Sequence, residues 1–164
     1  MRITAALTAA ALAALAACTM HERPATEPSF FVMRHLHKDV GQDPGLTAQG
    51  QECARRLATM LEGQGVAAIY VSTTRRARET AAPFAAASGI ATQDYPPADI
   101  AALAARARGE PGSVLIVGHS NTVPDIVEQL GGVRPGPIDE SRFGEVWRIA
   151  RAGGATSATR VPGC

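Results

Sequence analysis

The sequence predicts an α/β fold, a three-layer α/β/α sandwich around a mostly parallel central sheet. Short apolar runs at residues 30–33, 67–72 and 113–118 are rich in aliphatic and Phe side chains, which is typical of strands buried on both faces of a parallel sheet. Each run is followed by a segment that predicts a helix, and this alternation favours a layered α/β domain. A chain of 164 residues is long enough for one such domain with a real core.

The composition excludes two broad classes of protein. Hydrophobic residues make up 46% of the chain, charged residues 19%, and the formal net charge is +1. A nucleic-acid binder would show strong basic patches, and a disordered chain would have few apolar residues and a high net charge. The sequence also has no internal repeat, zinc-like Cys/His spacing, Walker-type loop or dinucleotide glycine fingerprint.

Residues 1–17 predict a secretory signal peptide. Arg2 supplies a short positive region, and the uncharged Ala/Leu run that follows is too short to span a bilayer stably. The run ends in Leu-Ala-Ala-Cys, which resembles the lipobox of bacterial lipoproteins. We therefore expect lipidation at Cys18, in preference to an ordinary signal peptide that is cut after a small residue.

The polar, Pro-bearing residues 18–28 predict a tether between the lipid and a domain at 29–164. Thr19 rather than Asp follows the cysteine, a pattern that in proteobacterial lipoproteins goes with sorting to the outer membrane. The resemblance thus implies a protein anchored in the membrane at the periplasmic face of the cell envelope. The inner and the outer membrane both remain open.

The first expected strand ends at Arg34 and His35, and a loop dense in turn residues follows at 39–45. A helix is predicted from Leu46-Thr47 to about Leu61, with Thr47 as its N-cap. Its apolar stripe includes Cys53. In an oxidising compartment Cys53 could pair with Cys164, or it could be a buried small residue with Cys164 free.

The second strand, at 67–72, leads into a helix that begins near Thr74 and ends at Gly89. Three arginines lie at its start, and since they point in different directions, at most two can face one ligand. Arg75 and Arg78 are interpreted as a solvated face stabilised by Glu79. A short edge strand is expected at residues 90–95.

A further helix is predicted from Ala98 or Asp99 to Arg108, before the strand at 113–118. The helix after His119 is expected to end near Leu130. Residues 143–150 and 156–161 predict a terminal hairpin with no role beyond closing the sheet.

Two histidines thus occupy matching positions, because His35 and His119 each follow a buried strand. The carboxyl ends of parallel strands are where open α/β sheets place their ligand sites. Arg34 could clamp an anion beside an imidazole nucleophile or base, and a helix start near Arg76 also favours anions.

These motifs, in this order and spacing, resemble those of the histidine phosphatase superfamily, in the branch of phosphoglycerate mutases and small protein-histidine phosphatases. The resemblance runs from Ser29 to about Ile149. It rests on the strand ending in Arg34-His35, the Leu-Thr-x-x-Gly helix start at 46–50, Ser-Thr-Thr-Arg-Arg-Ala-x-x-Thr-Ala at 72–81, and the strand ending in Gly118-His119.

The resemblance implies a phosphoglycerate mutase-like fold and assigns a role to each matching residue. His35 matches the nucleophile that becomes phosphohistidine, Arg34 and Arg76 match the phosphate-binding arginines, and His119 matches the histidine that hydrogen-bonds the phosphoryl oxygens. Two guanidiniums and a protonated His119 would stabilise charge on the transferring phosphoryl group without a metal or cofactor. A neutral His35, with one ring nitrogen held by a backbone carbonyl, could attack in line.

The chain also departs from the family pattern. Leu36 replaces the usual Gly or Ala, and His37-Lys38 replaces the frequent Glu-Lys, with His37 expected at the rim of the site. Ser120 stands where the acid-phosphatase branch has Asp, so Ser120 is expected to contact phosphate and the proton donor is not evident. Asp99 is the candidate donor, and Asp125 is the next.

The expected function is therefore hydrolysis of phosphate monoesters, or of phosphohistidine, with a phosphorylated small molecule or envelope component as substrate. Mutase activity is disfavoured because the chain lacks insertions that would enclose a bisphosphate. The alternative is a catalytically weak phosphate-binding envelope lipoprotein. The substrate and the oligomeric state remain open, and no nucleic-acid partner is expected.

Overall fold

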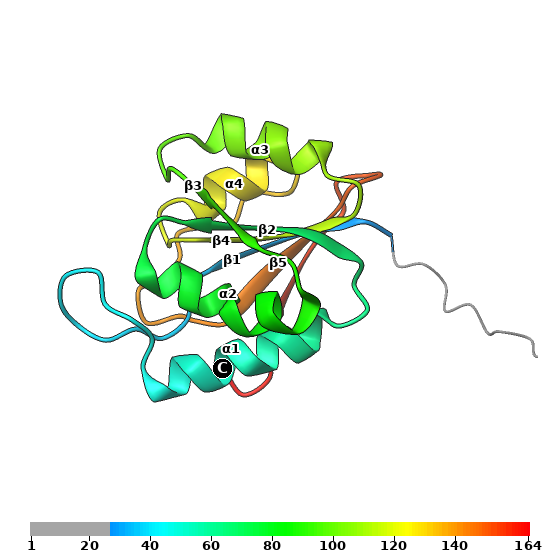
Figure 1. Ribbon diagram of the computed structural model, residues 1–164. Coiled ribbons are helices and arrows are strands. Elements are labelled where there is room, and N and C mark those ends of the chain that lie inside the picture. Colours follow the sequence, from blue (N-terminus) through cyan, green and yellow to red (C-terminus); the bar gives the residue numbers. More distant parts are fainter. Residues whose placement is uncertain (1–26) are drawn as a thin grey trace, which may run out of the picture.

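The computed structural model describes residues 27–164 (Figure 1). The predicted signal peptide, the lipidation site Cys18 and nearly all of the tether lie outside the described residues. No helix within 27–164 is both long and apolar enough to cross a membrane. The elements, in chain order, are β1 (Ser29–Arg34), α1 (Ala48–Leu61), β2 (Val66–Ser72), α2 (Arg75–Ser88), β3 (Thr92–Tyr95), α3 (Ile100–Gly109), β4 (Ser113–Gly118), α4 (Val123–Gln129), β5 (Glu145–Ala150) and β6 (Thr156–Arg160).

The sheet has six strands in the order β3-β2-β4-β1-β5-β6. The first four are parallel, whereas β5 and β6 form an antiparallel hairpin that pairs with β1. The predicted, mostly parallel sheet is confirmed, with β3 at one edge. The β1–β4 register aligns Arg34 with Gly118, so His35 and His119 leave the centre of the sheet at the same edge.

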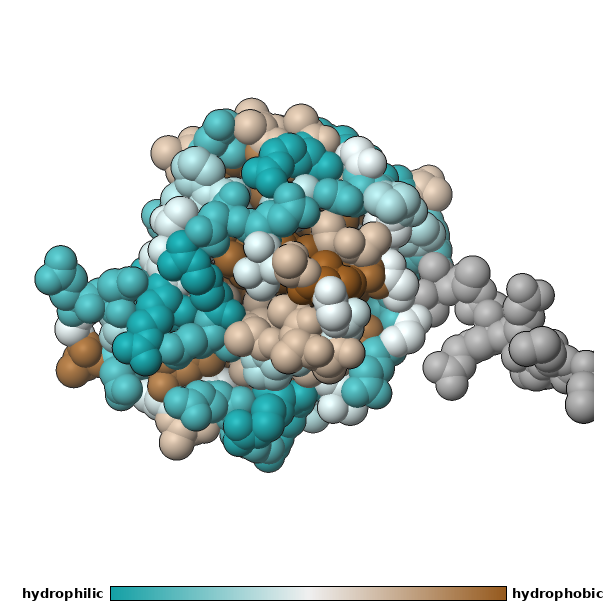
Figure 2. Space-filling model, viewed as in Figure 1, coloured by the Kyte–Doolittle hydropathy of each residue, from teal (hydrophilic) through white to brown (hydrophobic). Residues whose placement is uncertain are grey.

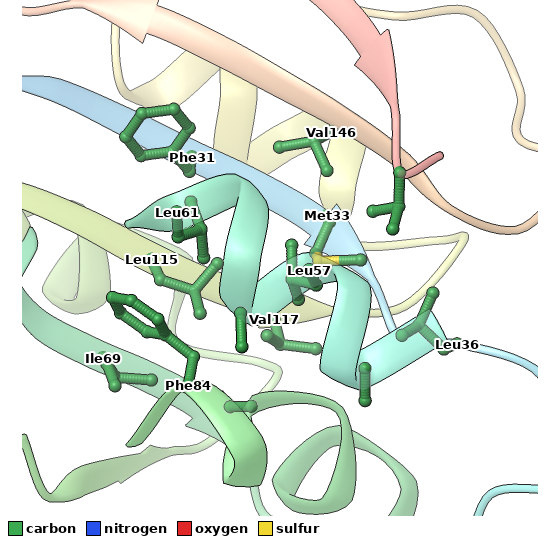
Figure 3. Close-up of a cluster of buried hydrophobic side chains, with 14 of the residues drawn as sticks. Phe31, Met33, Leu36, Leu57, Leu61, Ile69, Phe84, Leu115, Val117 and Val146 are labelled. Atoms are coloured by element: carbon green, nitrogen blue, oxygen red, sulfur yellow. The ribbon is translucent and has the colours of Figure 1, made fainter. Parts of the chain in front are cut away.

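The three predicted layers are confirmed, because α1 and α2 cover one face of the sheet and α3 and α4 cover the other (Figure 1). Alternate residues of β1 serve the two faces: Phe31 and Met33 pack toward α1 and α2, while Phe30 and Val32 pack toward α3 and α4. Burial on both faces is the physical reason for a continuous apolar run. Figure 3 shows the first cluster, in which Leu57 and Phe84 of the helices meet Leu115 and Val117 of the sheet.

The start of α1 is tied to the chain that follows β1. Thr47 is the predicted N-cap, and its side chain accepts a hydrogen bond from the Gly50 N–H (3.1 Å). The Thr47 N–H donates to the His37 carbonyl at 3.0 Å. A Cβ at Gly50 would lie 2.1 Å from that carbonyl oxygen. The Leu-Thr-x-x-Gly motif therefore ends in glycine because the backbone at His37 passes directly over the helix.

The C-terminus is fastened to α1 by a disulfide between Cys53 and Cys164. Of the two possibilities that the sequence left open, the structure contains the paired one. The chain after β6 returns over α1, where the Val161 N–H donates to the Gly144 carbonyl at 2.8 Å. The disulfide thus braces the segment that leads into β5.

Candidate active site

The four side chains predicted to form the site meet at the carboxyl edge of the sheet. His35 and His119 follow β1 and β4, and their ring centroids are 5.4 Å apart. Arg34 is the last residue of β1, and Arg76 lies in the first turn of α2. An Nη atom of Arg76 is 3.4 Å from Nδ1 of His119. The loop of residues 38–46 projects at the left of Figure 1, and Figure 2 shows mainly hydrophilic residues at the same side of the molecule.

His35 is held in the form that a nucleophile requires. Its side chain is buried, and its Nδ1 lies 2.9 Å from the carbonyl of Leu36. Since a carbonyl can only accept, the ring proton is on Nδ1, and Nε2 keeps a free lone pair. Burial, together with the positive charges of Arg34 and Arg76, lowers the pKa of His35 to about 3, although the hydrogen bond to the Leu36 carbonyl opposes this shift. The ring is therefore neutral at physiological pH.

Thr80 fixes the backbone that orients His35. Its buried hydroxyl accepts a hydrogen bond from the Leu36 N–H (3.0 Å) and donates to the Arg76 carbonyl (2.8 Å). One side chain thus links the end of β1 to the first turn of α2. Leu36 itself is fully buried in the core beside α1. The structure thereby accommodates a leucine at the position where the resemblance led us to expect glycine or alanine.

His119 is also neutral, and this corrects the expectation of a protonated ring. Burial, followed by the positive charges of Arg76 and Arg34, lowers its pKa to about 4. With Nδ1 accepting from Arg76, the ring proton lies on Nε2, where it can donate to an anion. The turn is tight: the His119 N–H donates to Oγ1 of Thr122 at 3.0 Å, and a Cβ at Gly118 would lie 2.9 Å from the same oxygen.

Both arginines carry a buried donor with no acceptor. Arg34 is 3% exposed, and one of its Nη atoms donates to the carbonyls of Asp139, Glu140 and Arg142. Among residues 27–164, nothing accepts a hydrogen bond from Nε of Arg34 or from Nε of Arg76. Buried polar groups are normally paired, so an unpaired donor calls for an explanation. Two such guanidinium donors beside two imidazoles are suited to an anion with several oxygens.

Two carboxylates that the sequence analysis missed form ion pairs with these arginines. Glu140 pairs with an Nη atom of Arg34 and accepts a hydrogen bond from the hydroxyl of Ser120. Asp43 lies 3.6 Å from Arg76 and accepts from the Arg75 N–H, which caps α2. Both are exposed and come from loops without periodicity or a motif. The only signal in the sequence is that both are acidic residues in loop segments that contain glycine and proline.

Phe143 is a further residue of the site, which corrects the expectation that the hairpin segment only closes the sheet. The Arg34 guanidinium lies 4.4 Å from the centre of its ring. The centre of the His37 ring lies 4.2 Å from the centre of the same ring. Phe143 therefore forms an aromatic wall that holds Arg34 in place. His37 lies beside Phe143 and is half-buried, as expected for a residue at the rim of the site.

Other predicted residues have different partners. Asp99 accepts a hydrogen bond from the Ala102 N–H (3.3 Å) and so caps α3. Asp125, on α4, is paired with Arg134. The structure thus gives neither candidate donor a contact with the two histidines. Arg75 pairs with Glu79 as predicted, and Arg78 pairs with Asp94. Within the described residues there is no group of three or more His, Cys, Asp or Glu side chains placed to hold a metal ion.

One family model and a set of solved structures are similar to this chain. A model of the histidine phosphatase superfamily (branch 1) matches residues 35–96, which include His35 and Arg76. Among curated proteins no sequence matches this chain. Residues 35–96 are thus similar to the histidine phosphatase superfamily, and the solved structures described next share the fold of the chain.

Solved structures share the fold. The protein histidine phosphatase SixA, complexed with tungstate, has a TM-score of 0.61 at 21% identity, covering 80% of this chain and 94% of that one. A mycobacterial glucosyl-3-phosphoglycerate phosphatase with inorganic phosphate has a TM-score of 0.58 at 16% identity, covering 80% and 95%. A phosphoserine phosphatase from Entamoeba histolytica, complexed with 3-phosphoglyceric acid, has a TM-score of 0.56 at 15% identity, covering 80% and 94%.

Proposed function

We propose that this protein is a phosphatase that hydrolyses phosphate monoesters through a phosphohistidine at His35. One observation supports the proposal: a neutral His35 with a free Nε2 stands among two arginines whose buried Nε donors find no acceptor in residues 27–164. Phosphoryl transfer requires positioning and stabilisation of charge on the equatorial oxygens. The cluster supplies both, and the solved phosphatases that share its fold support the assignment.

The reaction has two steps. In the first, the Nε2 lone pair of His35 forms a bond to phosphorus while the bond to the ester oxygen breaks, and the departing alkoxide takes a proton from water. In the second, a water molecule attacks the phosphohistidine, the P–N bond breaks, and inorganic phosphate leaves. Arg34, Arg76 and the Nε2–H of His119 donate to the phosphoryl oxygens in both steps. These groups supply the positive charge and the hydrogen bonds, so the proposed reaction uses no metal ion.

We further propose that the protein is attached to the cell envelope through Cys18 and faces the periplasm. The Leu-Ala-Ala-Cys motif supports the attachment. The Cys53–Cys164 disulfide supports the compartment, because disulfides persist outside the reducing cytosol. Expression of the full chain and its Cys18→Ser variant tests this: the wild type should partition with membranes, and the variant should not. Equal partitioning of the two would contradict the anchor.

Hydrolysis of phenyl phosphate by the wild type and by His35→Ala tests the enzymatic proposal. The variant should lose essentially all turnover because it lacks the nucleophile, while vanadate should still bind through the arginines. Ser88→Ala, an exposed change on α2 remote from the cluster, is the control. A wild type that binds phosphate or vanadate but does not turn over would leave the alternative, a phosphate-binding protein.

A further inference from the structure

A cavity lies beside the cluster of Arg34, His35, Arg76 and His119, and residues adjacent to this cluster in the sequence line it. Its volume is about 400 Å³, within the range of ligand pockets. Its lining includes Ser120, Asn121, Pro124, Pro135, Pro137 and Ile138. Ser120 directly follows His119, and Ile138 directly precedes the residues whose carbonyls hold Arg34. A substrate whose phosphate lies among the arginines would therefore extend into this cavity.

The walls are mainly apolar and stiff. Three prolines and Ile138 supply carbon surface, and Ile138 also packs against the core under α3 and α4. Proline has a fixed φ and little conformational freedom to lose when a ligand binds. Such a wall favours a flat or branched apolar group, which gains affinity in proportion to the area it buries.

The charges at the mouth disfavour an anionic group. Arg134 is the cation of the lining, and it is paired with both Asp125 and Glu128, the latter at 2.7 Å. This trio carries a net negative charge. Glu140 adds a further carboxylate where Ser120 joins the cavity to the phosphate cluster. A second phosphate or a carboxylate on the substrate would be repelled here.

We propose that this cavity binds the leaving group, and that it selects phosphate monoesters whose leaving group is apolar and bears no negative charge. The inference rests on the proposed function and narrows its substrate class. It separates this protein from enzymes that act on bisphosphates or on phosphorylated carboxylic acids. Aryl and alkyl phosphates are the expected substrates.

Binding of three stable phosphonates to the full chain tests the proposal without requiring turnover. Phenylphosphonate should bind about tenfold more tightly than methylphosphonate, because the ring fills the cavity. Carboxyphenylphosphonate should lose that gain. Equal affinities for the phenyl and methyl compounds, or an undiminished affinity for the carboxyphenyl compound, would overturn the proposal.

Two variants locate the effect. Ile138→Ala should reduce the phenyl advantage to about threefold and leave methylphosphonate binding unchanged, while Val133→Ala, an exposed neighbour outside the cavity, should change neither. Asp125→Asn combined with Glu128→Gln leaves Arg134 unpaired and alters only the surface. This variant should raise the affinity for carboxyphenylphosphonate about tenfold relative to phenylphosphonate. If Ile138→Ala left the phenyl advantage unchanged, or if the double variant left the affinity for carboxyphenylphosphonate unchanged, the proposal would be overturned.

The outcomes separate this inference from the function on which it rests. Selective binding of phenylphosphonate without hydrolysis of phenyl phosphate would overturn the proposed function and keep the cavity. Hydrolysis of phenyl phosphate and of phosphoglycerate at equal kcat/KM would keep the function and overturn the selectivity. Failure of all three phosphonates to bind, together with no hydrolysis of phenyl phosphate, would overturn both.

Discussion

Glu140 and Arg34 form the ion pair that a bound phosphate would have to rearrange. The carboxylate lies on an Nη atom of Arg34, yet its side chain is 73% exposed, whereas Arg34 is 3% exposed. Because the carboxylate is largely in water, the ion pair contributes little to stability. It places a negative charge against the arginine that we propose binds phosphate, so Glu140 would compete with the substrate's oxygens.

Glu140→Gln should therefore tighten the binding of inorganic phosphate by about twofold to fivefold, which corresponds to an exposed ion pair of about 0.5–1 kcal/mol. Inhibition of phenyl phosphate hydrolysis by phosphate measures the change. Glu62→Gln, an exposed change at the end of α1, is the matched control. Weaker phosphate binding in Glu140→Gln would show that the carboxylate positions Arg34 rather than competing.

The two histidines predict a pH dependence of stability. In the folded protein both are neutral, with pKa values of about 3 for His35 and about 4 for His119, whereas in the unfolded chain they titrate near 6.5. Between these values the unfolded state binds more protons, so stability falls as the pH falls from about 6.5 towards 4. The slope is at most about 1.4 kcal/mol per pH unit for each histidine.

Urea unfolding of the wild type and of His119→Gln, measured from pH 7 to pH 4, tests this. The variant should lose less stability on acidification, because it has one fewer group that must stay neutral when folded. Parallel curves for the two proteins would contradict the shifted pKa of His119. Comparing the two also removes the effect of the carboxylates, which titrate in both.

At the scale of elements, the site depends on how closely α1 approaches the end of β1. A Cβ at Gly50 would lie 2.1 Å from the His37 carbonyl oxygen, which is backbone and cannot swing away. Gly50→Ala should therefore lower the free energy of unfolding by about 2 kcal/mol or more, although alanine favours a helix over glycine by about 1 kcal/mol. Activity should fall as well, since the chain from His35 to His37 must shift.

The measurement is chemical denaturation of Gly50→Ala beside Gln51→Ala, an exposed position on the same helix. The Gln51 variant should keep wild-type stability and activity. A Gly50→Ala protein at least as stable as the wild type would show that helix propensity decides at this position, and that the close approach to His37 does not constrain it.

The elements were largely predictable from the sequence, and the loops were not. Continuous apolar runs predicted β1, β2 and β4, and the N-cap at Thr47 and the glycine at Gly89 bounded two helices as observed. The residues at the strand ends could be predicted for the same reason. His35 and His119 directly follow buried parallel strands, so both must lie at the carboxyl edge of the sheet. Asp43 and Glu140 reach the site through loops whose course depends on tertiary contacts, and no local pattern marks them. Phe143 was predicted as part of a strand, but its contact with Arg34 depends on the tertiary fold.

At the scale of the whole molecule, the Cys53–Cys164 disulfide closes most of the domain into one loop, because the two cysteines are separated by 111 positions in the sequence. Loop closure of this length stabilises by up to about 4–5 kcal/mol through the unfolded chain. The disulfide also braces the start of β5, because a Cβ at Gly144 would lie 2.9 Å from the Cβ of Cys164. Gly144 adjoins Phe143, so the disulfide also helps to hold Phe143 in place beside Arg34.

The double variant Cys53→Ala with Cys164→Ala should therefore unfold at a markedly lower urea concentration than the oxidised wild type. Dithiothreitol should lower the midpoint of the wild type towards that of the variant and leave the variant unchanged. If reduction left the wild-type midpoint where it was, the disulfide would carry no such stabilisation. Sequence alone left this pairing open because it depends on the return of the chain over α1.

The central claim is that His35 carries the phosphoryl group during turnover. The most direct measurement is mass spectrometry of the full chain, quenched in base during hydrolysis of phenyl phosphate, since phosphohistidine survives base and is lost in acid. The account predicts one phosphoryl group on His35 in the wild type and none in His35→Ala. A phosphoryl group on another residue, or a His35→Ala variant that hydrolyses phenyl phosphate at the wild-type rate, would contradict it.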